Sequence, residues 1–294
     1  MKNVVRRMAS ILFFPLFIWA KIFNGLVKGK VITLILHDLS ETDIVRFKRI
    51  VTFLNKYFRF ITPHEFEQMS RTGRIPKGIS FLITFDDGFK SSKIAAEQVL
   101  DPLRIKAAFF CCGSFIDMDE DEGNQFVAER IYQKTRKPSD IKRQEQAMTK
   151  SDLQQLIVSG HVVGCHTDTH PIISDINNYT DLALEFIHSK AKLEQITGTE
   201  ITWFAYPFGR IDCVNAFSLN CVKKHYKLCF SGVGGATNVN HPYALFRVSL
   251  ILQDPYLLQL SLVLGAASAF YWNQRRKLIS YCQSDPNNLK ATSF

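Results

Sequence analysis

The chain has 294 residues, 46% of them hydrophobic, and can bury a sizeable core as one large or two small domains. Its net charge is +9, but the basic residues are spread out, without the clusters or interleaved aromatic residues that nucleic-acid binding needs. That charge favours a membrane surface or an anionic glycolipid as partner. The lack of basic clusters argues against nucleic acid as a partner. Seven cysteines, odd in number and without framework spacing, favour a reducing compartment.

Residues 1–30 differ from the rest of the chain. Lys2, Arg6 and Arg7 precede an almost wholly apolar stretch over 8–20, and further lysines follow it. The stretch is short for a membrane-spanning helix and lacks a good small-x-small cleavage site for a signal peptide. We therefore expect an interfacial membrane anchor, with a signal peptide and a spanning helix as the alternatives.

Strands and helices alternate through residues 31–252. Apolar runs predict strands over 31–36, 60–61, 81–85, 107–112, 161–165, 201–205, 228–230 and 246–252. Helical spacing predicts helices over 42–57, 91–100, 149–158, 180–197 and 215–224, and a further helix with Thr62 as N-cap and Glu65 at its third position. Repeated alternation of this kind, with polar groups at strand ends, predicts an α/β fold built as a parallel barrel.

Two segments interrupt this alternation. Residues 117–149 are polar and charged, and their acidic start lacks the spacing of a calcium-binding EF-hand loop. We interpret them as a solvated insertion, which could still form a lid or a substrate wall. The glycine-rich stretch 232–235 lacks the spacing of a nucleotide or phosphate site and is interpreted as a loop.

The C-terminal part, residues 253–294, contains a second apolar segment over 256–272, followed by three basic residues at 275–277. It is short for a spanning helix. We expect a helix packed on the barrel or lying on the membrane, with a spanning helix as the alternative. If both terminal segments spanned, the basic residues would place the barrel outside the cytoplasm.

Two short stretches carry the chemistry. The buried strand before Asp86 and Asp87 ends abruptly at these two carboxylates and Gly88, and the strand over 161–165 runs into His166 and His170. The four-residue spacing lets both imidazoles face one point. One carboxylate and two imidazoles make a three-ligand metal set that leaves positions open for water and substrate.

These stretches resemble a known family. The segments 84–88 (TFDDG), 166–170 (HTDTH) and 206–209 (YPFG) resemble, in order, three motifs of the polysaccharide deacetylases, the NodB-like carbohydrate esterases. The resemblance covers about residues 31–252 and implies a seven-stranded, incomplete β/α barrel. It also implies hydrolytic removal of N-acetyl groups from amino sugars.

The resemblance also implies residue roles. Asp87, His166 and His170 would hold a divalent metal, and Asp86 would be the general base, which suits its alternation with Asp87 along the strand. The backbone N–H of Phe208, beside Pro207, would help to hold the oxyanion. Tyr206, Pro207, Arg210 and Arg247 are candidate substrate contacts.

The chain departs from the common family pattern in two places. The Arg that in many members precedes the proline and pairs with the base is missing, and Arg210 or Arg247 could replace it. The late Leu-x-His that supplies the general acid is also missing. The chain looks like the circularly permuted, poly-N-acetylglucosamine deacetylase-like branch, which places that His at the start, and His37 matches it.

The sequence therefore predicts a metal-dependent hydrolase that deacetylates a polysaccharide, an oligosaccharide or a lipid-linked glycan. The alternatives are a deformylase or deacylase of a lipid-linked sugar, and an inactive glycan-binding barrel. Zinc is the expected metal, and nickel, cobalt or manganese would fit the same ligands. We expect a membrane-associated protein at the cytoplasmic face, or, alternatively, one anchored or exported with its barrel outside the cytoplasm.

Overall fold

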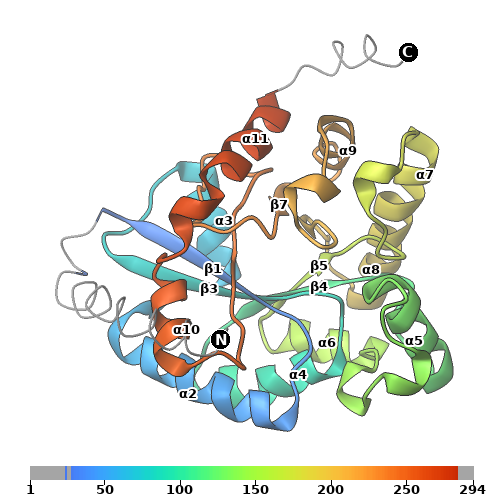
Figure 1. The fold of residues 1–294 in the computed structure, drawn as a ribbon, viewed down its shortest axis with the longest axis horizontal. Coiled ribbons are helices and arrows are strands. Elements are labelled where there is room, and N and C mark those ends of the chain that lie inside the picture. Colours follow the sequence, from blue (N-terminus) through green and yellow to red (C-terminus); the bar gives the residue numbers. More distant parts are fainter. Residues whose placement is uncertain (1–23, 25–27, 284–294) are drawn as a thin grey trace.

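The computed structural model describes residue 24 and residues 28–283. Its centre is a curled sheet of parallel strands, in the spatial order β7-β6-β5-β4-β3-β1-β8 (Figure 1). These seven strands are β1 (Lys30–Leu36), β3 (Ile79–Phe85), β4 (Ala107–Cys111), β5 (Val162–Cys165), β6 (Trp203–Ala205), β7 (Leu228–Phe230) and β8 (Val248–Ser249). The short β2 (Arg59–Phe60) also pairs in parallel with β3. The predicted incomplete β/α barrel is confirmed.

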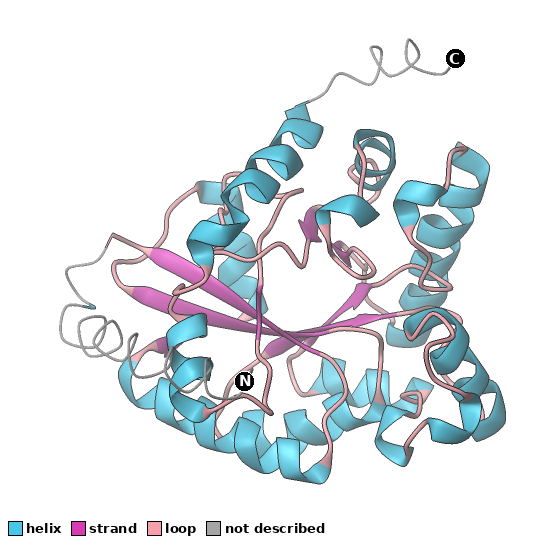
Figure 2. Cartoon of the chain, in the orientation of Figure 1, coloured by secondary structure: helices cyan, strands magenta, loops and turns pink. Residues whose placement is uncertain are grey.

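Helices surround the sheet, which lies in the middle of the molecule (Figure 2). The α-helices are α2 (Glu41–Tyr57), α3 (Pro63–Thr72), α4 (Lys90–Ala95), α5 (Glu120–Phe126), α6 (Lys150–Val158), α7 (Tyr179–Ala183), α8 (Ser189–Thr197), α9 (Ala216–Val222), α10 (Tyr256–Val263) and α11 (Trp272–Gln283). Three segments are π-helical: η2 (Ala96–Leu100) extends α4, η3 (Val127–Ile131) extends α5, and η7 (Leu184–His188) joins α7 to α8. Short 3₁₀ turns are η4 (Pro138–Asp140), η5 (Arg143–Glu145), η6 (Ile173–Asp175), η8 (Ile211–Cys213) and η9 (Ser268–Tyr271).

Helix starts follow local chemistry. The Thr62 side chain accepts from the Glu65 N–H while the Glu65 carboxylate accepts from the Thr62 N–H, so the predicted capping box of α3 is confirmed. Thr149 and Asp152 form the same reciprocal pair at the start of α6. These contacts satisfy amide groups that would otherwise have no partner in the first helical turn.

Two apolar clusters pack on opposite faces of the sheet. Ile32 and Leu34 face the larger cluster beneath the surrounding helices, whereas their neighbour Val31 faces a second cluster. This alternation is the two-residue period of a strand. In the second cluster, Phe66 from α3 lies against Trp203 and Phe230, with ring centroids 5.6 Å apart in both pairs, and fills the barrel interior.

Because the strands are parallel, their carboxyl ends meet at one edge of the sheet. His37 follows β1, Asp86 follows β3, His166 follows β5, and the segment 206–209 follows β6. The register pairs Leu36 with Phe85, and the Asp86 N–H continues the ladder by donating to the Leu36 carbonyl at 2.9 Å. The fold thus gathers four separate sequence motifs at one mouth.

The last strand is shorter than predicted. Leu245 first bridges to Phe230 of β7, and only Val248 and Ser249 then pair with β1. Residues 246–252 therefore do not form one continuous strand, because the segment crosses from one edge of the sheet to the other.

The apolar segment 256–272 is not one helix. It divides into α10 and η9, and Gly265, with φ 101°, lies between them. Across the residues the structure describes, no helix has the length and apolarity needed to cross a bilayer. The predicted anchor, residues 1–30, lies almost entirely outside the described residues.

Candidate active site

Asp86 and Asp87 are positioned by the abrupt end of β3. Both side chains are only 2% exposed. Asp87 has φ 75°, an uncommon value for a residue other than glycine, and the Gly88 N–H donates back to the Asp86 carbonyl at 3.0 Å. This tight turn gives two adjacent carboxylates different surroundings.

Asp87, His166 and His170 converge on one point. Oδ1 of Asp87 lies 3.3 Å from Nε2 of His166 and 3.3 Å from Nε2 of His170. Nδ1 of His166 donates to the Ala205 carbonyl at 2.8 Å, and Nδ1 of His170 donates to the Arg130 carbonyl at 3.3 Å. Because a carbonyl only accepts, Nδ1 of each ring carries a proton, and Nε2 of each ring points toward Asp87.

This donor set fits a divalent metal. One atom from each of the three buried residues lies within 4.8 Å of the others. A carboxylate with two imidazoles, each imidazole oriented by a carbonyl on its far nitrogen, is how proteins present ligands to zinc and similar ions. The predicted ligands are thus brought together with the correct ring nitrogens inward.

The His166–His170 loop is held by contacts within itself and with α8. Thr167, with φ 68°, accepts from the His170 N–H at 3.0 Å through its hydroxyl, as expected for a residue that supports the loop. Ser189 donates to the Thr167 carbonyl at 2.9 Å. Backbone strain of this kind persists only where surrounding contacts enforce it.

Glu185 also holds this loop. Its carboxylate accepts from the N–H groups of Asp168 and Thr169, each at 2.9 Å, and from the Thr169 hydroxyl at 2.6 Å. This contact of Glu185 is not predicted from the sequence. Its position in a predicted amphipathic helix, fifteen residues after His170, carried no signal of a contact with the loop.

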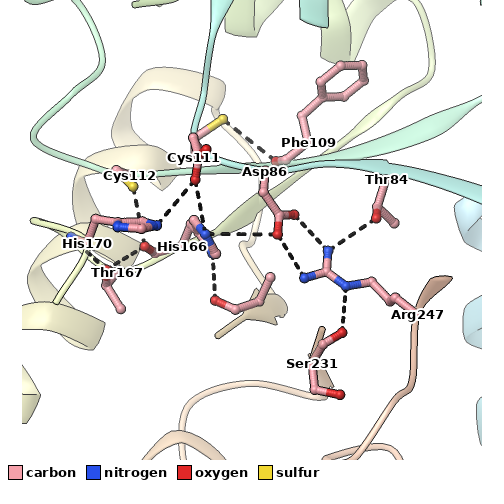
Figure 3. Close-up of polar contacts among 12 residues, drawn as sticks. Thr84, Asp86, Phe109, Cys111, Cys112, His166, Thr167, His170, Ser231 and Arg247 are labelled. Carbon is pink, nitrogen blue, oxygen red and sulfur yellow. Dashed lines mark hydrogen bonds and ion pairs between the residues drawn. The ribbon is translucent and has the colours of Figure 1, made fainter. Parts of the chain in front are cut away.

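Asp86 is paired with Arg247, as Figure 3 shows. Nη1 of Arg247 donates to Oδ1 at 2.7 Å and Nη2 donates to Oδ2 at 2.8 Å, a bidentate pair between two buried side chains. Arg247 also donates to the Thr84 hydroxyl at 3.2 Å and to the Ser231 carbonyl at 2.9 Å. The arginine partner of Asp86 is therefore Arg247 and not Arg210.

His37, Phe208 and Arg210 line the same cavity as the two acids and the two histidines. This catalytic cavity measures about 340 Å³. Phe208 has φ 58°, its ring lies 4.6 Å from that of His170, and its N–H has no backbone partner among residues 28–283. The next residue, Gly209, allows the close approach, since a Cβ there would lie 2.3 Å from the Gly232 nitrogen.

Three predicted substrate contacts need correction. Tyr206 is fully buried in the core and its hydroxyl donates to the Tyr243 carbonyl, so it does not line the cavity. Pro207 is also buried and away from the cavity wall. Arg247 is fully buried, and its guanidinium is used by Asp86, which leaves it no free edge for substrate.

The insertion over 117–149 forms part of the cavity wall. Ile131 lines the cavity, and the neighbouring Arg130 carbonyl binds His170. Carbonyl groups in the last turn of a helix lack helical partners, so η3 leaves one free to accept from the histidine. We expected a solvated insertion, with a lid or a substrate wall as the alternative. The position of Ile131 in the cavity wall favours that alternative.

His161 and the cysteines near the site are structural. His161 is buried, accepts from the Ala107 N–H through Nδ1 at 3.0 Å and contacts Asp101 through Nε2 at 3.1 Å, and burial lowers its pKa. Every cysteine in the described part of the chain is free. Cys111 and Cys112 are buried in the core, and burial raises the pKa of both thiols, which keeps them protonated.

Charge in the site is balanced between acids and histidines. Burial opposes the charge on Asp87, but hydrogen bonds from His166 and His170 outweigh it and hold the pKa of Asp87 well below its usual value. Burial likewise opposes the charge on His166, yet Asp86 and then Asp87 raise its pKa above the usual value. The site is therefore built to hold positive charge between the two acids.

Comparison with known proteins identifies the family. The family profile described as polysaccharide deacetylase matches residues 74–223, half of the chain. A search of curated proteins finds no matching sequence. Among solved structures, a polysaccharide deacetylase from Bacillus cereus superposes with a TM-score of 0.59 at 22% identity, covering 81% of this chain and 70% of that one.

Two other structures match nearly over their whole length. Deacetylase PplD from Streptococcus pyogenes, in complex with acetate, has a TM-score of 0.61 at 17% identity and covers 80% of this chain and 99% of its own. IcaB from Ammonifex degensii has a TM-score of 0.61 at 19% identity and covers 88% and 99%. At these identities the likeness concerns the fold.

The matched range includes the carboxylate pair, both histidines and Phe208, but not β1, β7 or β8. The flanking strands place His37 at the cavity, as expected for the permuted branch, and bring Arg247, one of the two candidate replacements for the missing Arg, onto Asp86. With the profile match, the motifs and the fold in agreement, the chain belongs to the polysaccharide deacetylase family.

Proposed function

We propose that this protein is a metal-dependent hydrolase that removes N-acetyl groups from amino sugars of a polysaccharide, an oligosaccharide or a lipid-linked glycan. The observation that supports this proposal most directly is that one cavity contains two carboxylates with different partners. Asp87 lies 3.3 Å from both inward-facing Nε2 atoms, while the adjacent Asp86 is held by Arg247. A barrel that only bound glycan would need neither arrangement.

The residues divide the work of amide hydrolysis. A divalent cation held by Asp87, His166 and His170 would polarise the carbonyl and lower the pKa of a bound water. Asp86 accepts a proton from the attacking water, and Arg247 keeps both carboxylate oxygens oriented for it.

The C–N bond then breaks, and the leaving nitrogen takes a proton from His37, so that water and amide give a carboxylate and an amine. The Phe208 N–H stabilises the oxygen that becomes negatively charged.

The direct test is release of acetate from an N-acetylglucosamine oligomer by purified protein, with and without added zinc, beside Asp86→Asn. We expect metal-dependent release that falls by roughly 10²–10⁴-fold in the variant, the usual contribution of a general base. Oligomer binding and metal content should survive in Asp86→Asn. Metal binding without release from any N-acetyl sugar would refute the deacetylase, and oligomer binding without turnover would favour the glycan-binding alternative.

Zinc is the proposed metal, because a mixed carboxylate and imidazole set suits it. Nickel, cobalt and manganese bind similar ligands, and which ion is bound depends on the availability of each metal and on the coordination geometry it prefers. Metal-free protein reconstituted with each ion in turn, at equal occupancy, would rank them by acetate release.

We also propose that the protein works on a membrane surface at the cytoplasmic face, with residues 1–30 as the membrane-associating segment and the α10–α11 region as a second membrane contact. Phe270 and Trp272 support this, with exposed fractions of 84% and 59%, because aromatic side chains of this kind favour the interface. Arg276 and Lys277 follow on the same helix and are exposed, which suits anionic headgroups. The unpaired cysteines support a reducing compartment.

Sedimentation with vesicles containing phosphatidylserine tests this proposal. We expect binding that weakens with salt and falls in a Phe270→Ser/Trp272→Ser variant, while Val158→Ser, which changes a side chain that is 88% exposed, has no effect. Equal binding by all three proteins would refute a role for the α10–α11 region.

A further inference from the structure

A second cavity, of about 120 Å³, lies beside the catalytic cavity and is not used by the proposed chemistry. Its wall comes from the glycine-rich loop 232–235, the β8 region and the turn between α10 and α11. The aliphatic and aromatic part of this wall consists of Val248, Ile251, Leu262, Ala267 and Tyr271.

The two cavities adjoin. Gly232 and Ser249 line both of them. Gly232 also donates through its N–H to the Gly209 carbonyl at 2.8 Å, and Gly209 directly follows Phe208, whose N–H is the proposed oxyanion donor. The second cavity therefore lies next to the position proposed for the reacting carbonyl.

The two arginine side chains at this second cavity are already engaged. The Arg247 guanidinium is bound to Asp86, Thr84 and Ser231. Nη1 of Arg275 donates to the carbonyls of Gly234 and Ser268, at 2.7 Å each. Apart from Arg247, Tyr271 and the hydroxyls of Ser249 and Ser268, the lining side chains are apolar or absent, so the cavity suits a hydrocarbon group better than a sugar ring, which needs several hydrogen bonds.

The size of the cavity limits that group. An engineered apolar cavity of about 150 Å³ holds a benzene molecule, so a cavity slightly smaller takes roughly four or five carbon atoms. A long lipid chain would not fit. A sugar-linked N-acyl group somewhat longer than acetyl would.

We propose that this second cavity, which we name the acyl cavity, receives the tail of an N-acyl group of about four to six carbons on the amino sugar. The inference rests on the proposed function, because it assigns the acyl substituent of the same hydrolysis. The reaction is unchanged, with water added across the C–N bond, and the product is a short-chain carboxylate in place of acetate.

The experiment compares glucosamine oligomers that carry N-acetyl, N-butanoyl, N-hexanoyl and N-decanoyl groups. We expect kcat/KM to rise roughly tenfold from acetyl to butanoyl, given about 0.8 kcal/mol per buried CH₂, and to fall for decanoyl, which exceeds the cavity. A steady fall from acetyl onwards would overturn the proposal while leaving the deacetylase intact.

Two matched variants locate the effect. Ala267→Leu fills the acyl cavity, whereas Ala266→Leu adds the same side chain at the neighbouring half-buried position that does not line it. The ratio of kcat/KM for hexanoyl over acetyl should fall at least about tenfold in Ala267→Leu and stay at the wild-type value in Ala266→Leu. Equal ratios in both variants would refute the assignment.

Binding of hexanamide, followed by saturation-transfer NMR, separates the acyl cavity from catalysis. We expect wild-type protein and Ala266→Leu to bind it and Ala267→Leu to lose the signal, whether or not any sugar is hydrolysed. If no acyl sugar is hydrolysed but this pattern holds, the proposed function fails and the acyl cavity stands. Absence of binding in all three proteins would overturn the acyl cavity.

Discussion

Asp86 and Asp87 are neighbours in the chain and equally buried, yet their surroundings are opposite. Asp87 faces two imidazole nitrogens, and Asp86 faces a guanidinium. Burial alone therefore does not set the role of a carboxylate; the partner does, because the partner decides whether the acid is available to a metal or held for proton transfer.

The two sites are also built differently. The proposed metal-ligand site takes its three residues from two motifs that both precede β6, and Thr167 and Glu185 stiffen the second motif. The Asp86 site depends on Arg247, a partner 161 positions away in the sequence. Arg247 lies in the segment that first bridges to β7 and then pairs with β1. The first site should tolerate changes in the late part of the chain, and the second should not.

The largest expected effect is loss of metal. In Asp87→Ala we expect no stoichiometric zinc and a fall in kcat/KM of at least about a thousandfold, because the cation supplies several kcal/mol of transition-state stabilisation. Metal analysis and acetate release give the two readouts. The adjacent Asp86→Asn should keep its zinc, and loss of zinc there would remove the distinction between the two acids.

Removing Arg247 should cost stability. Arg247→Met leaves Asp86 buried without its partner, and we expect a loss of roughly 3–5 kcal/mol in the free energy of unfolding, measured with urea. Arg210→Met breaks the exposed pair with Asp212 and should cost about 1 kcal/mol or less. Similar losses in both variants would contradict the buried pair.

Glu185→Gln should weaken the metal site without emptying it. The amide removes the charge that holds two backbone N–H groups, and we expect zinc affinity to fall roughly 10–100-fold. Glu194→Gln, on the following helix α8, should leave zinc affinity unchanged even if stability drops. Competition with a chromophoric chelator measures both, and unchanged affinity in Glu185→Gln would show that the loop is held without it.

The smallest effect concerns the insertion. Burial opposes the charge on Glu145, but hydrogen bonds from Arg136 and Tyr132 outweigh it and lower its pKa. A depressed acid pKa contributes stability that is full above the unfolded value, about 4.3, and is lost as pH falls through the folded value. Glu145→Gln should cost about 1–2 kcal/mol at pH 7, and the difference from wild type should shrink below about pH 4. A difference independent of pH would contradict this.

Local signals predicted much of the fold. The capping box at Thr62 and Glu65 and the apolar run before Asp86 both depend on contacts within a few residues. Periodicity missed the shortness of β8, because this segment crosses from β7 to β1, which are far apart in sequence. It also missed the end of α10, although Gly265, with φ 101° directly after the C-cap Leu264, is a local signal of a helix end.

By itself, the sequence determined the alternating strands and helices, the family motifs and the identity of the three proposed metal ligands, because strand ends and a four-residue His spacing are local properties. Only the tertiary structure decided that Arg247 pairs with Asp86, that the Arg130 carbonyl orients His170, and that Tyr206 belongs to the core. Those contacts join residues tens to more than a hundred positions apart, and nothing in a linear pattern records which distant side chains meet when parallel strands bring their carboxyl ends to one edge.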